Sequence, residues 1–237
     1  SKSYTQLKND SECFSKALAS LGEQEKHIAI IGNTSYTWVA AYFGIVNCGS
    51  VAVPLDAQLS AEELCELLNR ADVTTLVYDE SKANVADMAS SKCPQIKHFI
   101  ALSKNSTMSN TLYFEELIKQ QEPGFECEIE PEQLATIMFT SGTTGKSKGV
   151  MLTHRNIAEN TTCLDMKFEP KTVLLTVLPI HHAYCLSMDI LKALYTGAII
   201  CINDSLMRVA QNIKLFKPNM ILMVPLMIES MAKKLED

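Results

Sequence analysis

Apolar positions along the chain follow two different spacings. Short apolar runs such as residues 27–31 and 74–78 are typical of buried strands. Between them, apolar residues recur every three or four positions, as over residues 5–21, which predicts an amphipathic helix. Because the two patterns alternate throughout, the sequence predicts an α/β fold in which helices flank β-sheets.

Polar residues mark where several of these helices begin. Ser35 is a favourable N-cap for a helix that ends at Gly49. Ser60 and Glu63 have the spacing of a capping box for a helix through Arg70. Further strands are expected over residues 51–54, 97–102, 134–139, 150–152, 173–178, 198–202 and 220–224. Further helices are expected over residues 82–90, 182–195 and 206–216, and two more are expected to begin at Thr153 and near Pro225.

Composition and charge narrow the class of protein. The chain has 237 residues, of which 47% are hydrophobic and 20% charged, as in ordinary globular domains. The net charge is −6 and Lys and Arg do not cluster, which argues against nucleic acid as a partner. The apolar stretches are too short for a transmembrane segment.

The 8 cysteines are widely spaced. No C-x-x-C pair occurs, so the cysteines show no zinc-binding pattern and we expect no metal site. Most lie in apolar stretches, as expected of reduced, buried thiols. Since the chain also opens without a signal peptide, we expect a cytoplasmic protein. The oligomeric state does not follow from the sequence.

One segment carries most of the chemical information: residues 140–149, with the sequence TSGTTGKSKG. Its glycines allow the backbone N–H groups to converge, its hydroxyls add donors, and its lysines add positive charge. The segment contains no acidic residue, so it is suited to bind a polyphosphate anion. Strands are predicted on both sides of it.

This loop differs from two common phosphate loops. A Walker A motif has a glycine where this chain has Thr140, and it runs directly into a helix. The dinucleotide-binding motif has a G-x-G-x-x-G spacing that is absent here. A solvated surface turn is the simplest alternative, but the density of glycines and hydroxyls between two strands argues against it.

Residues 140–156 resemble the signature of the adenylate-forming (AMP-binding) superfamily, which includes acyl-CoA synthetases such as long-chain fatty acid–CoA ligases. The similarity continues beyond the loop through Thr153-His154-Arg155-Asn156. Ser147 departs from the family pattern, in which proline usually precedes the second lysine; we expect a looser loop. Other matching segments lie, in order, at residues 3–7, 44–56, 178–182 and 224–225.

The resemblance implies two packed α/β lobes. Residues 28–168 would form the first lobe with the phosphate loop, and residues 172–237 would begin the second lobe together with residues 1–26. The family's catalytic C-terminal domain has no counterpart in residues 1–237. We therefore expect an N-terminal fragment, a partial AMP-binding domain of a larger ligase, that does not complete thioester synthesis by itself.

The implied reaction is attack of a carboxylate on the α-phosphorus of ATP with Mg²⁺, followed by transfer of the acyl group to CoA. Thr140 and Lys148 are the expected catalytic residues. Lys146 is interpreted as a solvated surface lysine. The residues expected to bind the nucleotide are Thr140, Ser141, Gly142, Thr143, Thr144, Gly145 and Lys148.

His182 lies where the family lines its carboxylate-substrate pocket. An imidazole cannot supply the anion that would pair with the ammonium group of an amino acid. His182 therefore favours a plain carboxylic acid, such as a fatty acid, although a core or capping histidine is the alternative. Tyr184 and Met188 belong either to the acyl pocket or to the core.

Three other functions remain open at this point. The activated acid could pass to a carrier protein instead of CoA. A P-loop hydrolase would instead require a helix directly after Ser147. A non-catalytic module that keeps the fold is the third alternative.

Overall fold

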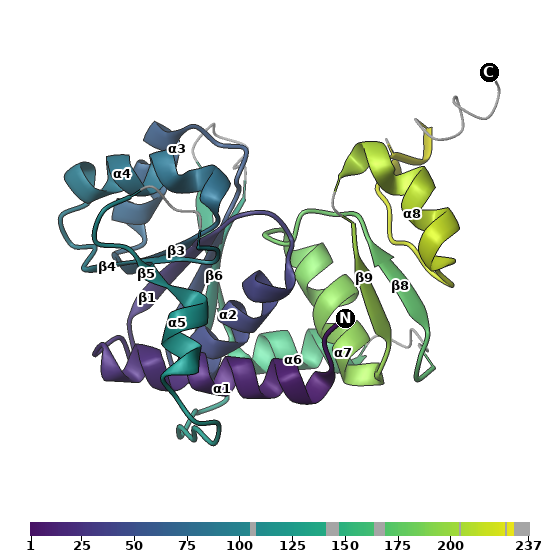
Figure 1. Ribbon diagram of the computed structural model, residues 1–237, viewed down its shortest axis with the longest axis horizontal. Helices are drawn as coiled ribbons and strands as arrows, with labels where there is room; N and C mark the ends of the chain where they lie inside the picture. Colours follow the sequence, from purple (N-terminus) through teal and green to yellow (C-terminus); the bar gives the residue numbers. More distant parts are fainter. Residues whose placement is uncertain (105–107, 141–146, 164–168, 204, 226, 230–237) are drawn as a thin grey trace. The chain divides into compact units, whose positions relative to one another are not determined.

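The computed structural model describes residues 1–104, 108–140, 147–163, 169–203, 205–225 and 227–229 (Figure 1). The chain divides into two compact units, Ser1–Ile157 and Ala158–Asp237.

The first unit is built on a seven-stranded sheet in the order β5-β4-β3-β1-β2-β6-β7. Neighbouring strands are parallel except for β6 and β7, which pair antiparallel. Most of the predicted strands are confirmed, and their apolar runs are buried except over residues 150–152, where Val150 and Met151 are exposed. The strands are β1 (His27–Ile31), β2 (Val51–Leu55), β3 (Val73–Tyr78), β4 (His98–Ala101), β5 (Leu112–Tyr113), β6 (Leu134–Thr140) and β7 (Lys148–Thr153).

Helices cover the sheet on both faces. Alternate strand residues such as Ala29 and Val53 share one buried cluster with the helices α3 (Ala61–Arg70) and α4 (Ala83–Lys92). The helix α2 (Tyr36–Asn47) contacts β1 and β2 and presents the buried Trp38 and Tyr42. The N-cap at Ser35 and the capping box at Ser60 and Glu63 are both present, as predicted.

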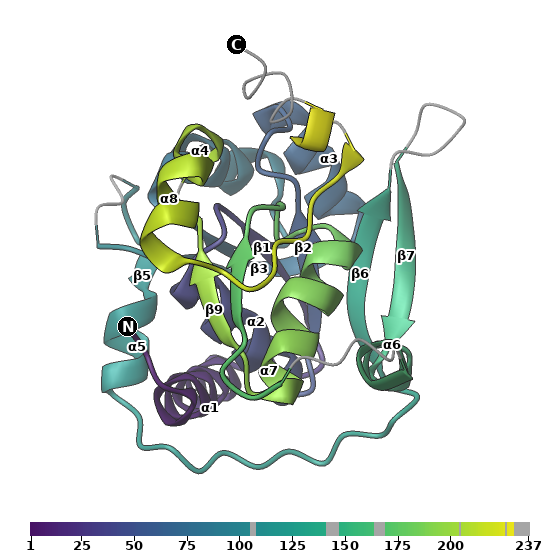
Figure 2. The ribbon, with the colours of Figure 1, turned by 90° about the vertical axis from the view of Figure 1, so that its right-hand side faces the viewer.

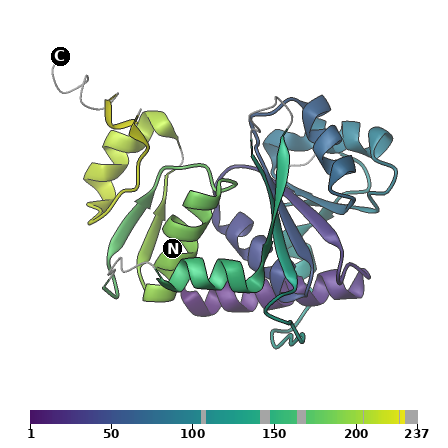
Figure 3. The same ribbon diagram turned by 180° about the vertical axis from the view of Figure 1, so that it is seen from behind.

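The helix α1 (Tyr4–Ser20) packs on α2 and on α5 (Phe114–Lys119) within the first unit, and Figure 3 shows it in purple beside α2. The rings of Phe14 and Phe114 lie 4.8 Å apart, and Ser15 donates a hydrogen bond of 2.9 Å to the Gly44 carbonyl. A side chain at Gly44 would collide with Phe14, so this glycine permits the close approach of the two helices. We expected residues 1–26 to belong to the second lobe. The structure instead places them in the compact unit Ser1–Ile157, because the apolar stripe of α1 is buried against α2. The remaining division into lobes stays a prediction.

The second unit has two parallel strands, β8 (Val173–Thr176) and β9 (Ile199–Ile202). They are connected by the π-helical segment η2 (Cys185–Lys192) and the helix α7 (Ala193–Thr196), which ends at Gly197 in a left-handed conformation. After the short 3₁₀-helix η3 (Leu206–Arg208), α8 (Val209–Phe216) packs on β8.

Four elements differ from the sequence prediction. Residues 220–224 do not form a strand, because only Met220 makes a bridge, to Leu174 of β8. The predicted helix over residues 182–195 contains the π-helical segment η2. The short strand β5 and the helix α5 were not predicted, since they are too brief to show a periodic pattern.

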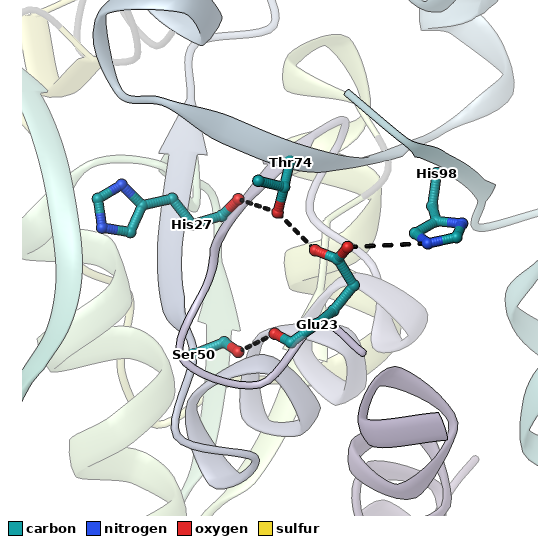
Figure 4. A network of polar contacts seen from close by, with 5 residues as sticks. All are labelled: Glu23, His27, Ser50, Thr74 and His98. Carbon is teal, nitrogen blue, oxygen red and sulfur yellow. Dashed lines mark hydrogen bonds and ion pairs between the residues drawn. The ribbon is translucent and has the colours of Figure 1, made fainter. Parts of the chain in front are cut away.

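A buried acidic residue joins the amino ends of several strands (Figure 4). The side chain of Glu23 is 1% exposed, and its Oε2 accepts a hydrogen bond of 2.5 Å from the Thr74 hydroxyl on β3. Its Oε1 lies 3.7 Å from Nε2 of His98, at the start of β4. The Glu23 carbonyl accepts a hydrogen bond of 2.5 Å from Ser50, which directly precedes β2. One residue outside the sheet thus fixes the starts of three strands.

Candidate functional site

The predicted phosphate loop connects the antiparallel strands β6 and β7, which stand side by side in Figure 2. Its two ends meet at the pair Thr140 and Lys148. This connection confirms the prediction that the loop links two strands. The P-loop hydrolase alternative is wrong, because a strand and not a helix follows Ser147.

Thr140 and Lys148 are exposed and lie directly opposite each other at the loop end of the hairpin. A hydroxyl donor and an ammonium group therefore flank the place where the loop begins and ends, an arrangement suited to an anion. The other predicted nucleotide-binding residues lie outside the described part of the chain; they are Ser141, Gly142, Thr143, Thr144 and Gly145.

A buried hydrogen bond attaches β6 to the rest of the first unit. The Tyr42 hydroxyl on α2 lies 3.0 Å from the Thr136 hydroxyl on β6, and both residues are buried. Burial raises the pKa of Tyr42 to about 12, so its hydroxyl remains protonated at neutral pH. Since each hydroxyl satisfies the other, the start of β6 is held on α2 without an unpaired polar group.

Gly149 allows the two strands to meet closely next to the loop. A Cβ atom at this position would lie 3.1 Å from Cγ2 of Ile137 and 3.5 Å from the ring of Phe139. Gly149 pairs with Phe139 in the hairpin, so a larger residue there would displace the strand that carries Lys148. The last glycine of the predicted loop therefore has a packing role.

The residues after β7 stabilise the base of the hairpin. Thr153 and Asn156 cap the helix α6 (His154–Cys163) reciprocally: the Thr153 hydroxyl accepts from the Asn156 N–H at 3.2 Å, and the Asn156 side chain accepts from the Thr153 N–H at 3.1 Å. Arg155 forms an ion pair with Glu132, just before β6. The Thr-His-Arg-Asn segment of the family signature thus has a structural role here.

Arg70, at the end of α3, contacts the hairpin and was not predicted as a site residue. Its Nη2 donates a hydrogen bond of 2.9 Å to the Ser147 carbonyl. Its guanidinium carbon lies 5.8 Å from the centre of the Phe139 ring. No local sequence pattern could have revealed this contact, since Arg70 and Ser147 are separated by 77 residues.

His182 belongs to the second unit, whereas the hairpin and Arg70 belong to the first. It is exposed, its backbone N–H donates to the Pro179 carbonyl at 3.2 Å, and its ring centre lies 4.1 Å from that of His181. Tyr184 is exposed, whereas Met188 is buried and belongs to the core. The helix that starts at this turn continues as η2, whose widened turns are frequent at functional sites.

The segment η2 contains an acid, Asp189, whose side chain is 0% exposed. Its Oδ2 accepts a weak hydrogen bond of 3.8 Å from the Cys185 thiol, whereas its Oδ1 has no partner among the described residues. Burial raises the pKa of Asp189 to about 7. Burial also raises the pKa of the Cys185 thiol, which is therefore a neutral donor and not a nucleophile.

No three His, Cys, Asp or Glu side chains in the described part of the chain are grouped so that they could hold a metal ion. Nor does any described helix have the length and apolar character required to cross a membrane.

Comparison with known protein families shows the family to which the chain belongs. The family model described as "AMP-binding enzyme" matches residues 1–237. The chain belongs to the AMP-binding enzyme family. The resemblance noted at residues 140–156 is thereby confirmed over the whole chain.

Curated relatives of this AMP-binding chain are considerably longer. It is 28% identical over 254 residues to the chloroplastic long-chain-fatty-acid–[acyl-carrier-protein] ligase AEE15 of Arabidopsis thaliana, with 96% of this chain and 34% of the relative covered. It is 26% identical to long-chain-fatty-acid–CoA ligase 5 of Rattus norvegicus, with 99% of this chain and 38% of the relative covered. The chain thus spans about a third of the length of these relatives.

Solved structures of AMP-binding enzymes share the fold. Coronafacic acid ligase from Pectobacterium brasiliense matches 100% of this chain and 47% of its own, with a TM-score of 0.87 and 18% identity. The N-terminal domain of FACL13 from Mycobacterium tuberculosis matches 97% of this chain and 57% of its own, with a TM-score of 0.84 and 22% identity. These similarities confirm the predicted α/β architecture.

Proposed function

We propose that this chain provides the nucleotide-binding hairpin of a ligase that activates a carboxylic acid with ATP. The observation that supports this most directly is the hairpin itself: the Gly- and Thr-rich loop joins two antiparallel strands in a chain whose full length matches the AMP-binding family. The product of the first step would be an acyl-adenylate, with pyrophosphate as the leaving group.

The chemical difficulty of this step is electrostatic, because a carboxylate must approach the negatively charged triphosphate. Negative charge also builds on the departing pyrophosphate. The Lys148 ammonium and the Thr140 hydroxyl, which are exposed and opposite each other, would compensate that charge together with the donors of residues 141–145. Donors fixed in position before the reaction stabilise the transition state without reorganisation.

The ions and cofactors follow from the same proposal. Mg²⁺ would enter with the triphosphate and neutralise part of its charge. The donors present in the hairpin, a hydroxyl and an ammonium group, fit a phosphate and not a metal ion. CoA would accept the acyl group after adenylation. We assign no residue of this chain to CoA or to Mg²⁺.

We propose that the acid is a fatty or other plain acyl acid. His182 is exposed at the start of its helix and offers no carboxylate to an amino acid substrate. The acyl-carrier-protein ligase among the relatives favours a second candidate, in which a carrier protein replaces CoA as acceptor. Both candidates share the adenylation step.

The test is ATP–pyrophosphate exchange by the complete polypeptide that contains this sequence, with fatty, aryl and amino acids supplied in turn. Exchange that depends on a fatty acid supports the proposal, and thioester formation with CoA or with a carrier protein then separates the two acceptors. Exchange with amino acids alone would contradict the substrate class. Absence of exchange with every acid would contradict adenylation and favour a non-catalytic module. We expect residues 1–237 alone not to reach the exchange rate of the complete polypeptide.

A further inference from the structure

We propose that Arg70 is a positioning residue that holds the carboxyl end of the phosphate loop in place. The inference rests on the proposed function of the hairpin, because it assigns Arg70 a role in how that hairpin receives a triphosphate.

Arg70 contacts one residue on each side of the loop: Ser147, directly before β7, and Phe139 of β6. Its hydrogen bond of 2.9 Å holds the carbonyl of Ser147, the residue directly before Lys148. Its guanidinium lies over the ring of Phe139, the residue directly before Thr140. One side chain on α3 therefore contacts the residue next to each member of the Thr140–Lys148 pair.

The position of the Arg70 contact matters because Ser147, unlike a proline, has no ring that restricts its φ angle. A free φ at the end of a loop lets the following residue change direction. A hydrogen bond to the Ser147 carbonyl fixes the peptide group between Ser147 and Lys148. We infer that Arg70 thereby restricts the direction in which the Lys148 side chain leaves the strand.

The chemistry of arginine suits this task. Its planar guanidinium can donate to a carbonyl in its plane while one face lies against an aromatic ring. A lysine ammonium is a compact point charge and cannot maintain both contacts with the same geometry. The proposal therefore predicts that charge alone is not sufficient at position 70.

Global stability depends little on this contact. Arg70 is exposed and α3 is held by its buried leucines, so an interaction at the surface contributes little to the free energy of unfolding. Arg70→Ala and Arg70→Lys are expected to fold like the parent protein. Lys92→Ala is the matched control, since Lys92 is an exposed cation in the last turn of the neighbouring helix α4.

The experiment has two readouts on the complete polypeptide. The first is the KM for ATP in pyrophosphate exchange, which we expect to rise about tenfold in Arg70→Ala, equivalent to about 1.4 kcal/mol. We expect most of that rise in Arg70→Lys and none in Lys92→Ala. The second is amide hydrogen exchange without nucleotide, which we expect to become faster over residues 147–153 in both Arg70 variants only.

The outcomes separate this inference from the proposed function. A parent protein without ATP-dependent exchange would contradict the proposed function, while faster hydrogen exchange in the Arg70 variants would still establish the contact. An active parent with unchanged KM and unchanged hydrogen exchange in both Arg70 variants would overturn the inference. An Arg70→Lys variant with parental values and a defective Arg70→Ala would show that charge suffices, which also contradicts it.

Discussion

The first unit contains two polar clusters of opposite character. Around Glu23, a carboxylate that is 1% exposed is surrounded by the Thr74 hydroxyl and the His98 ring, at the amino ends of the strands. At the carboxyl end of β6 and the start of β7, Thr140 and Lys148 are exposed on the hairpin. The first cluster has its partners within the protein, whereas the second presents its donors to the outside.

This difference separates residues that stabilise the fold from residues that are available to a ligand. A buried polar group must be hydrogen-bonded within the protein, and its loss is measured as a loss of stability. An exposed cation contributes little to stability, so its loss is measured in binding or catalysis. The following predictions test that separation.

The largest effect is expected for Lys148→Ala on the proposed reaction. Loss of one positioned cation at a developing negative charge should reduce the rate of pyrophosphate exchange about 100-fold. The free energy of unfolding should change by less than about 0.5 kcal/mol, because the side chain is exposed. Exchange kinetics and denaturant unfolding measure the two effects.

Lys92→Ala serves as the control for Lys148→Ala, since it also removes one exposed cation. It should leave both quantities unchanged. Equal loss of activity in the two variants would show that net charge, and not the position of Lys148, supports the reaction.

The opposite behaviour is expected for Glu23→Ala. Removing the carboxylate leaves the Thr74 hydroxyl without its shortest hydrogen bond and should lower the free energy of unfolding by about 2 kcal/mol. The exchange rate of the folded protein should stay at the parental value. Glu23→Gln retains an acceptor for Thr74 and should lose about half as much stability. A change in the KM for ATP without a change in stability would reverse the assignment of this cluster.

Asp189 of the second unit is buried like Glu23, but among the described residues its carboxylate has only a thiol as partner, which makes its charge unfavourable. Its pKa is about 7 in the folded protein, above the unfolded value of about 3.9. The folded state therefore binds more protons between these values, and stability should rise as the pH falls from about 8 to about 5, by roughly 1 to 2 kcal/mol.

The measurement for Asp189 is denaturant unfolding as a function of pH. Asp189→Asn removes the titrating group, so the slope between pH 5 and pH 8 should flatten and stability above pH 7 should increase. The same slope in the parent and in Asp189→Asn would show that other groups cause it.

The smallest effect is expected where a buried hydrogen bond attaches the hairpin to the helix α2. Tyr42→Phe leaves the Thr136 hydroxyl unpaired and should cost about 1 kcal/mol of stability. Tyr42→Phe combined with Thr136→Val removes both polar groups and should recover most of that loss. A double-mutant cycle in thermal unfolding measures the coupling, and strictly additive losses would mean that the hydrogen bond contributes nothing.

Much of the fold could be predicted from local patterns. The strands β1, β3 and β6 are rich in apolar and β-branched residues, and the capping box at Ser60 and Glu63 is encoded within four residues. The position of the phosphate loop between two strands was also predictable, because apolar residues flank it on both sides. In each case the determining interactions lie close together in the sequence.

The errors concern elements that depend on distant partners. Residues 220–224 have the composition of a strand, yet only Met220 finds a place beside β8. The helix over residues 5–21 was correct, but its position on α2 depends on the space left by Gly44. No periodic pattern could show which surface covers that helix.

The sequence by itself determined the α/β class, the helix caps and the position of the Gly- and Thr-rich loop between two strands, since these depend on residues within a few positions of one another. Only the tertiary structure decided that Arg70 contacts the hairpin, that Glu23 joins the starts of three strands, and that Asp189 is buried next to the Cys185 thiol. The reason is physical: burial and hydrogen bonding between distant segments depend on how the whole chain packs, and no short stretch of sequence contains that information.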